Sequence, residues 1–240
     1  MNRARVTTDF LARRLEQVQE RIAHAAQRSR RNPLNITLIA VTKTHPPALI
    51  RDAYQVGLRH FGENYVQEWK QKQEHFPPTA FPDLHWHFIG HLQRNKAKFL
   101  VGKVALIHSV DNVRLAEKIS QLAVARGVTV PILLQVNTSG ELSKYGCSPD
   151  QLLPLAEKVL PLPNLHVQGL MTLAAYVTPA ERTRPMFALL RQLRDQLESA
   201  FPEFAPFPEL SMGMSNDFEI AIEEGATMIR IGTALFGERS

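Results

Sequence analysis

The stretches ITLIAVT (36–42) and VPILLQVN (130–137) decide the fold. Each is a short, nearly continuous apolar run of the kind that forms parallel strands buried on both faces of a sheet. Each is followed by a segment whose apolar residues recur at helical spacing, at 47–56 and 149–159. A strand followed by a helix, repeated along a chain, is typical of an α/β protein with a parallel sheet.

The same strand-then-helix unit recurs to the end of the sequence, giving eight units in about 205 residues. The predicted strands are 36–42, 59–62, 84–90, 104–110, 130–137, 165–172, 209–212 and 227–232. The predicted helices are 47–56, a segment through Trp69, 93–100, 113–126, 149–159, 179–200, 216–224 and a short tail from Thr233 or Ala234.

Eight such units predict a single (β/α)8 TIM-type barrel, because a sheet of eight parallel strands closes naturally on itself. A doubly wound open sheet is the alternative, but no GxGxxG motif follows the first strand. No Gly/Ser-rich linker divides the chain, and the proline clusters at 77–82 and 202–208 are expected to be loops. We therefore expect one barrel domain over residues 33–240.

An extra helix is predicted before the barrel, within an Arg-rich segment covering residues 1–32. We expect it to run from Thr7 to Arg31, with Thr7 or Thr8 as its N-cap and Pro33 ending it. Its apolar face consists of residues at three- and four-residue spacing: Phe10, Leu11, Leu15, Val18, Ile22 and Ala25.

The net charge of +5 comes entirely from this segment. Residues 1–31 carry eight arginines and three acidic residues, and the remaining chain has 20 basic and 20 acidic residues. A nucleic-acid-binding protein would spread a basic face over its fold, so we expect no nucleic-acid partner. The segment is either a solvated Arg-rich helix face or a weak contact for an anionic partner.

Composition places the chain among ordinary globular proteins, with 44% hydrophobic and 21% charged residues among 240. No apolar run reaches the roughly 20 residues that span a bilayer, so we expect no membrane association. The N-terminus has no apolar signal-peptide core. The single cysteine, Cys147, forms no internal disulfide and is expected to be half-buried or buried in a reducing cytoplasm.

The C-terminal ends of barrel strands are where active sites lie in this architecture. Lys43 directly follows the first strand and would point into a crowded barrel mouth. Burial there would lower its pKa, and a neutral amine can form a Schiff base with an aldehyde. The alternative is a lysine that reaches solvent or pairs with a carboxylate.

Two loops at the same end predict a phosphate site. They are SMGMSND (211–217) and RIGTALFG (230–237), which follow the seventh and eighth strands, where barrels frequently bind phosphate. Gly213 and Gly232 allow close approach of the backbone, and Ser215 and Thr233 offer hydroxyls before helix starts. Ser-Asn-Asp is also an ordinary N-cap sequence, which is the structural alternative.

A lysine and a phosphate cradle on one rim suggest pyridoxal 5'-phosphate (PLP). Arg230 lies two residues before Gly232 and so shares its strand face, where it could donate to the pyridine nitrogen. An arginine there keeps the nitrogen unprotonated and weakens the ring as an electron sink. The alternative is a salt bridge from Arg230 to Glu219, Glu223 or Glu224.

Five motifs resemble the YggS/PROSC family of pyridoxal-phosphate homeostasis proteins, and the chain is similar to its cyanobacterial members, called PipY. The motifs are AVTKTHP (40–46), FGENYVQE (61–68), WHFIGHLQRNKAK (86–98), LSMGMSNDFEIAI (210–222) and TMIRIGTALFG (227–237). The resemblance covers the chain from about residue 35 to the end. It implies a (β/α)8 barrel related to the N-terminal domain of alanine racemase.

The resemblance also implies roles for eight cofactor-binding residues. Lys43 would carry the Schiff base, and Ser215, Gly232 and Thr233 would hold the phosphate. Arg230 would face the ring nitrogen, supported by Ser211. The remaining two, lining the cofactor, would be Asn64 and Met214.

The function implied is a carrier or regulator of PLP without established catalysis. A racemase needs a base on each face of the substrate carbanion, and eight units leave no residues for the second domain that supplies one in alanine racemase. Tyr65 and Tyr145 are not compelling substitutes. An open barrel mouth suits transfer of PLP to apo-enzymes. The alternative is a PLP-dependent amino-acid racemase or a related fold-type III enzyme. We expect a monomer.

Two further features are ranked lower. His85, His87 and His91 could suggest a metal site, but we expect none, because satisfied barrel histidines are the more frequent explanation. Lys144 lies in the loop after the fifth strand and could approach the cofactor rim, although a solvent position is favoured.

Overall fold

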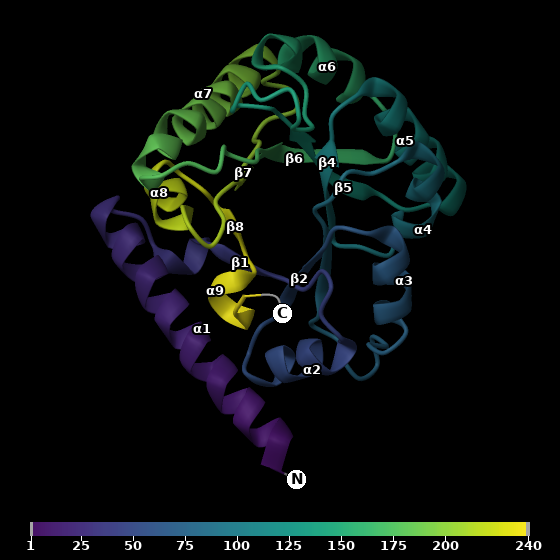
Figure 1. The fold of residues 1–240 in the computed structure, drawn as a ribbon. Helices are drawn as coiled ribbons and strands as arrows, with labels where there is room; N and C mark the ends of the chain where they lie inside the picture. The colour runs from purple at the N-terminus through teal and green to yellow at the C-terminus, as the bar shows by residue number, and fades with distance from the viewer. Residues whose placement is uncertain (1, 239–240) are drawn as a thin grey trace.

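The computed structural model describes residues 2–238, with side chains from residue 8. Eight parallel strands form a closed barrel in the order β1 to β8, surrounded by helices (Figure 1). This confirms the predicted (β/α)8 barrel and excludes the open sheet. The strands are β1 (Thr37–Val41), β2 (His60–Glu63), β3 (His85–Phe88), β4 (Leu106–Val110), β5 (Val130–Gln135), β6 (Leu165–Met171), β7 (Glu209–Ser211) and β8 (Met228–Ile231).

The helices follow the predicted alternation. They are α1 (Asn2–Arg28), α2 (Pro47–Gln55), α3 (Val66–Gln73), α4 (Ala97–Leu100), α5 (Val113–Arg126), α6 (Leu152–Val159), α7 (Arg184–Ala200), α8 (Phe218–Glu223) and α9 (Thr233–Phe236). Five of them are shorter than predicted: α2, α4, α6, α7 and α8. The helices predicted over 93–100, 149–159 and 179–200 each begin with a 3-10 turn, a common way to tighten a helix end.

Two hydrophobic clusters stabilise the barrel. The larger one fills the space between the strands and the surrounding helices. The smaller one lies apart from it and consists of Ile39, Leu106, Leu133, Met171 and Met228, with Leu173 packed against it. The residues of the smaller cluster come from strands β1, β4, β5, β6 and β8, so this cluster is the apolar filling of the barrel interior.

Helix α1 differs from its predicted limits at both ends. It already includes Thr7 and Thr8, so neither residue caps it. It ends before Pro33 is reached, because the backbone turns at Arg30, whose φ is 56°, and the Arg31 N–H donates to the Ala26 carbonyl at 2.8 Å. A left-handed residue that closes the last turn is a common helix C-terminus.

The arginines of the N-terminal segment help to attach α1 to the barrel. Arg21 pairs with Glu219 and Arg28 with Glu223, each at 2.7 Å. Arg31 donates to one carbonyl in the last turn of α8 and to another in the loop that follows it. These three arginines therefore bond to the barrel, although the side chains of Arg21 and Arg28 remain 43% and 55% exposed to solvent. In Figure 1 the helix lies along α8 and α9, outside the ring of strands.

The apolar face predicted for α1 is confirmed with one exception. Leu11, Leu15, Val18, Ile22 and Ala25 are buried against the barrel, whereas Phe10 is 47% exposed.

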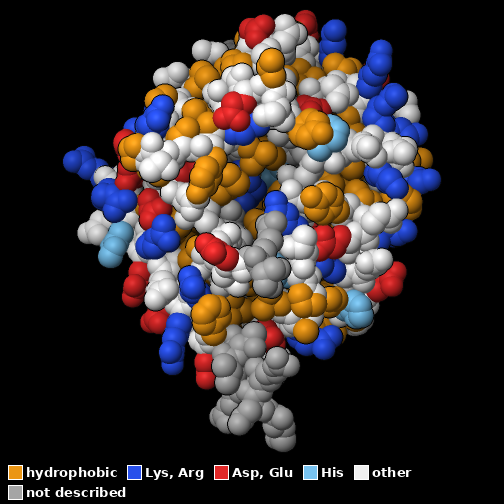
Figure 2. Space-filling view, in the orientation of Figure 1, with side chains coloured by type: hydrophobic (Ala, Val, Ile, Leu, Met, Phe, Trp, Pro, Cys, Tyr) orange, Lys and Arg blue, Asp and Glu red, His pale blue; other side chains and the backbone are white. Residues whose placement is uncertain are grey.

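None of the helices in the described part of the chain is both long and apolar enough to cross a membrane. On the face shown in Figure 2, basic and acidic side chains are interspersed.

Candidate functional site

A pocket of about 830 Å³ lies at the C-terminal ends of the strands. It is lined by residues at or just after the ends of seven strands: β1, β2, β3, β5, β6, β7 and β8. Of the eight residues predicted to bind a cofactor, seven line it: Lys43, Asn64, Met214, Ser215, Arg230, Gly232 and Thr233. The eighth, Ser211, is fully buried and contacts Arg230. The structure therefore brings the predicted residues together at one site.

Lys43 is half-buried at the pocket wall, two residues beyond the end of β1. The next residue, Thr44, has φ 66°, a conformation that is rare for a β-branched residue. The Thr44 N–H donates to the Glu68 carboxylate on α3. This contact holds the turn that carries Lys43, and no sequence pattern predicts it.

A buried charged network supports the same turn. Lys72 of α3 donates to the Thr42 carbonyl at 2.6 Å, to Glu63 at 2.7 Å and to Glu68 at 2.7 Å. The Thr42 hydroxyl donates to Glu63 Oε1 at 2.6 Å. Burial raises the pKa of Glu63, and the neighbouring Lys72 ammonium opposes that rise. Lys72 thus ties α3 to the backbone immediately before Lys43.

Asn64 leaves an acceptor available at the pocket. Its Oδ1 is buried and has no hydrogen-bond partner among the described residues. The backbone of Asn64 is fixed by close packing on Gly90, where a Cβ would lie 2.1 Å from the Asn64 carbonyl oxygen. A buried amide oxygen without a partner is unfavourable, and a donor on a ligand would satisfy it.

Arg230 is only 3% exposed and lines the inner end of the pocket. Its guanidinium donates to Ser211 Oγ at 2.6 Å and to the Thr172 carbonyl at 2.7 Å. Burial lowers its pKa to about 10, against the opposing effect of Asp217, so it is charged at neutral pH. The alternative salt bridges are wrong, because the three carboxylates considered pair with arginines of α1 and α7: Glu219, Glu223 and Glu224.

The two predicted phosphate loops contact each other. The Ala234 N–H donates to Ser215 Oγ at 3.2 Å, and the Met214 N–H donates to Asp217 Oδ1 at 2.6 Å. Burial raises the pKa of the Asp217 carboxyl. Ser215 therefore lies against the first turn of α9, where backbone N–H groups have no partner within the helix.

The two glycines of these loops differ in what they do. Gly213 has φ 91°, and a Cβ there would lie 2.6 Å from Ala221 Cβ, so the fold itself requires glycine. Gly232 has φ −114°, and a Cβ there would meet Val41 at an ordinary 3.6 Å. The fold would accept alanine at 232, so the glycine there keeps space open at the pocket wall.

Two further residues line the pocket: Lys144, for which a solvent position was favoured, and Tyr176, which was not predicted to be there. Lys144 donates to the Ala174 carbonyl at 2.7 Å and lines the pocket, so the less favoured prediction for it is the correct one. Tyr176, 81% exposed, stands at the rim in the segment after β6. The rule that barrel sites use the loops after every strand could also have pointed to Tyr176.

The histidines do not gather around a metal. His87 is buried and bonded to His60 and His108, as expected of a satisfied barrel histidine, and His91 stacks on Tyr145 instead. Within residues 2–238, no group of three or more His, Cys, Asp or Glu side chains could hold a metal ion. Cys147 is half-buried as predicted, and burial raises its pKa to about 12.

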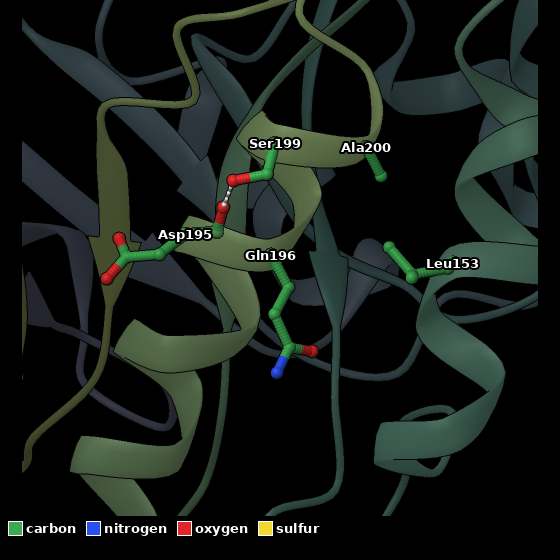
Figure 3. Close-up of a pocket in the computed structure, with 5 residues that line it drawn as sticks. All are labelled: Leu153, Asp195, Gln196, Ser199 and Ala200. Atoms are coloured by element: carbon green, nitrogen blue, oxygen red, sulfur yellow. Dashed lines mark hydrogen bonds between the residues drawn. The ribbon is translucent and has the colours of Figure 1, made fainter.

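A second concavity, of about 500 Å³, lies between α6 and α7 (Figure 3). Ser199 there donates to the Asp195 carbonyl at 2.9 Å, a contact within one helix, and the Asp195 carboxylate pairs with Arg194. The polar residues that line this depression all belong to α7, whereas those of the barrel mouth come from several strand ends, so the barrel mouth is the better candidate site.

The fold and site define a class of protein. Residues 14–240 match the family model described as alanine racemase, N-terminal domain. Alanine racemase of Clostridium difficile shares the fold, with a TM-score of 0.73 at 14% identity over 96% of this chain and 57% of that one. This chain is thus a barrel of the alanine racemase N-terminal type.

Closer relatives identify the family within that class. A protein of Aquifex aeolicus named pyridoxal phosphate homeostasis protein is 48% identical over 94% of this chain and 97% of its own length. The structure of PipY of Synechococcus elongatus with PLP bound is 40% identical, with a TM-score of 0.81, over 95% of this chain and 100% of that one. The chain belongs to the pyridoxal phosphate homeostasis protein family.

Proposed function

We propose that this chain binds PLP in the barrel-mouth pocket and serves PLP homeostasis as a carrier or regulator. The observation that carries the proposal is the convergence of Lys43, Arg230 and the Ser215 and Gly232 loops on one pocket. The names of its relatives, a pyridoxal phosphate homeostasis protein and PipY with PLP bound, support the same proposal. We place the protein in the cytoplasm, as a monomer, with apo-PLP enzymes as recipients.

The donor set fits this cofactor. PLP supplies an aldehyde that a lysine amine can bind covalently, and Lys43 is the residue proposed to do so. Ser215, Gly232 and Thr233 would hold the phosphate. Because the fold would accept a Cβ at position 232, we attribute the glycine there to the room that the phosphate needs. Arg230 would face the pyridine nitrogen, Asn64 would offer its unpartnered oxygen, and Met214 would complete the wall.

Covalent attachment is tested by absorbance and borohydride reduction of the PLP-loaded protein. Lys43→Ala should abolish the reducible adduct and its absorbance near about 420 nm, a region typical of lysine-bound PLP. Lys144→Ala is the matched control, because Lys144 is another lysine of the same pocket. An adduct that survives in Lys43→Ala and disappears in Lys144→Ala would reassign the attachment point.

We further propose that the protein does not turn over amino acids. Racemisation needs bases on both faces of the substrate carbanion. Tyr176 is the tyrosine at the pocket rim, and its 81% exposure leaves its hydroxyl in solvent, a poor setting for a positioned base. Arg230, charged and buried, disfavours a protonated ring nitrogen and so weakens carbanion stabilisation.

Hydrogen exchange at Cα in heavy water separates carrier from enzyme, because a single base suffices for it. We expect no exchange with proteinogenic amino acids above the rate of free PLP, and transfer of PLP to an added apo-enzyme. Rapid exchange that disappears in Lys43→Ala would favour the alternative, a PLP-dependent racemase or a related fold-type III enzyme.

A further inference from the structure

A continuous chain of hydrogen bonds crosses the barrel interior and ends on Arg230. His60 Nδ1 lies 2.9 Å from His87 Nε2, and His87 Nδ1 lies 2.9 Å from His108 Nε2. His108 Nδ1 lies 2.9 Å from Ser211 Oγ, which accepts from Arg230 at 2.6 Å. His87 and His108 thus form hydrogen bonds through both ring nitrogens, and His60 takes part through its Nδ1.

The chain connects the two ends of the barrel. His60 is the first residue of β2, whereas Ser211 is the last residue of β7. The N-terminal ends of parallel strands lie at the barrel base and their C-terminal ends at the mouth. His60 is half-buried and stacks on the exposed His85, with ring centroids 4.8 Å apart. His87, His108 and Ser211 are buried.

Arg230 fixes the direction of every donor in the chain. A guanidinium can only donate, so Ser211 Oγ must accept from it. The Ser211 hydroxyl proton then needs an acceptor, and within the described structure His108 Nδ1 is the one in reach. His108 therefore carries its proton on Nε2 and donates to His87 Nδ1. By the same step His87 carries its proton on Nε2 and donates to His60 Nδ1.

This direction suits a buried cation. In the described chain no carboxylate oxygen lies within ion-pair distance of Arg230. With protons on Nε2, each imidazole turns its negative nitrogen toward Arg230, and hydrogen bonds in series polarise one another. Burial lowers the pKa of His87 to about 3 and places that of His108 well below its ordinary value, so both rings are neutral at pH 7.

We propose that His60, His87, His108 and Ser211 form a hydrogen-bond relay of fixed direction that holds and stabilises the Arg230 guanidinium in the pocket. The three histidines are positioning residues, since none of them lines the pocket. The effect of the relay on bound PLP rests on the proposed function, but its existence does not. Through the relay, the position and electrostatic stabilisation of Arg230 depend on residues as far away as His60 at the barrel base.

The direction of the relay is tested without cofactor. Long-range proton–nitrogen NMR correlation on the 15N-histidine-labelled chain at pH 7 distinguishes the two neutral tautomers from the charged ring. Signals are assigned with single His→Gln variants, and the exposed His166 is an internal reference. We expect His60, His87 and His108 as neutral rings protonated on Nε2. A proton on Nδ1 of His87 or His108 would overturn the proposal.

Its reach to the pocket is tested on the PLP-loaded protein with matched variants. His108→Leu removes the acceptor for Ser211, whereas His108→Asn keeps an acceptor at the same position. We expect His108→Leu to weaken PLP binding about tenfold and shift its absorbance, as for loss of a hydrogen bond to a charged group, with recovery in His108→Asn. His87→Leu touches neither Ser211 nor Arg230 and should give a smaller shift of the same sign.

The outcomes separate the relay from the proposed function. Unchanged affinity and absorbance in His108→Leu would overturn the relay, and an effect confined to His108 variants would reduce it to one local contact. If the unaltered chain binds no PLP, the proposed function fails, and the tautomers observed without cofactor still decide the relay.

Discussion

Replacing His87 with glutamine should make the stability of the protein less sensitive to acid. His87 is 3% exposed, and burial with the neighbouring His60 and His85 lowers its pKa from 6.5 to about 3. The folded chain therefore leaves this ring neutral at a pH where the unfolded chain protonates it. Falling pH then favours unfolding, from about pH 6.5 down to about pH 3.

The magnitude follows from that difference. Between pH 7 and pH 5 one such histidine lowers the free energy of unfolding by ~2 kcal/mol, since each pKa unit corresponds to about 1.4 kcal/mol. Glu63 and Asp217 act in the opposite direction, because their raised pKa values favour the folded state as protons are added. Both remain in the variant, so a comparison of the two proteins isolates His87.

Urea unfolding of the two proteins at pH 7 and pH 5 measures the effect. Glutamine can still donate toward His60, but it cannot titrate, so the destabilisation caused by His87→Gln should be ~2 kcal/mol smaller at pH 5 than at pH 7. His166→Gln is the comparison variant, because it removes an exposed imidazole. An equal destabilisation by His87→Gln at both pH values would refute the view that His87 is held neutral.

Two further predictions concern the phosphate loops. Ser215→Ala should weaken PLP binding by roughly 1–3 kcal/mol, because one hydroxyl is lost while backbone donors remain, and equilibrium dialysis measures it; an unchanged dissociation constant would remove Ser215 from the site. Gly232→Ala should weaken PLP binding without changing the melting temperature, because its Cβ would make only an ordinary contact with Val41, at 3.6 Å. Gly213→Ala should lower the melting temperature, because its Cβ would clash with Ala221 at 2.6 Å. Calorimetry with and without PLP checks both, and equal melting temperatures in the two variants would contradict the distinction.

The barrel could be predicted from the sequence because its signal is local. Each strand is a short apolar run, and each following helix has its own periodicity, so the eight units are visible without knowledge of any long-range contact. The strand ends then locate Lys43, Asn64 and the two glycine loops on one rim. The exact limits of the helices depend on turn geometry, such as the left-handed Arg30 after α1, which the pattern does not encode.

The relay could not be predicted in the same way. His60, His87, His108, Ser211 and Arg230 come from five strands, and only the closed barrel brings them together. His108 sits inside an apolar strand and His60 inside a weak one, so neither has a local signal. The support for Lys43 is equally non-local, because Lys72 reaches back from α3 to the backbone of Thr42.

The polar relay explains why the barrel interior is not filled as barrels usually are. Branched apolar residues generally occupy such an interior in layers, whereas here the smaller apolar cluster shares it with a buried polar set: His87, His108, Ser211 and Arg230. Desolvating those groups opposes folding, and an apolar replacement of a buried polar set is often as stable or more so. The relay offsets this cost electrostatically, because its oriented dipoles stabilise the buried charge of the Arg230 guanidinium. We therefore expect variants selected only for stability to lose the histidines, and with them the position of Arg230 in the pocket.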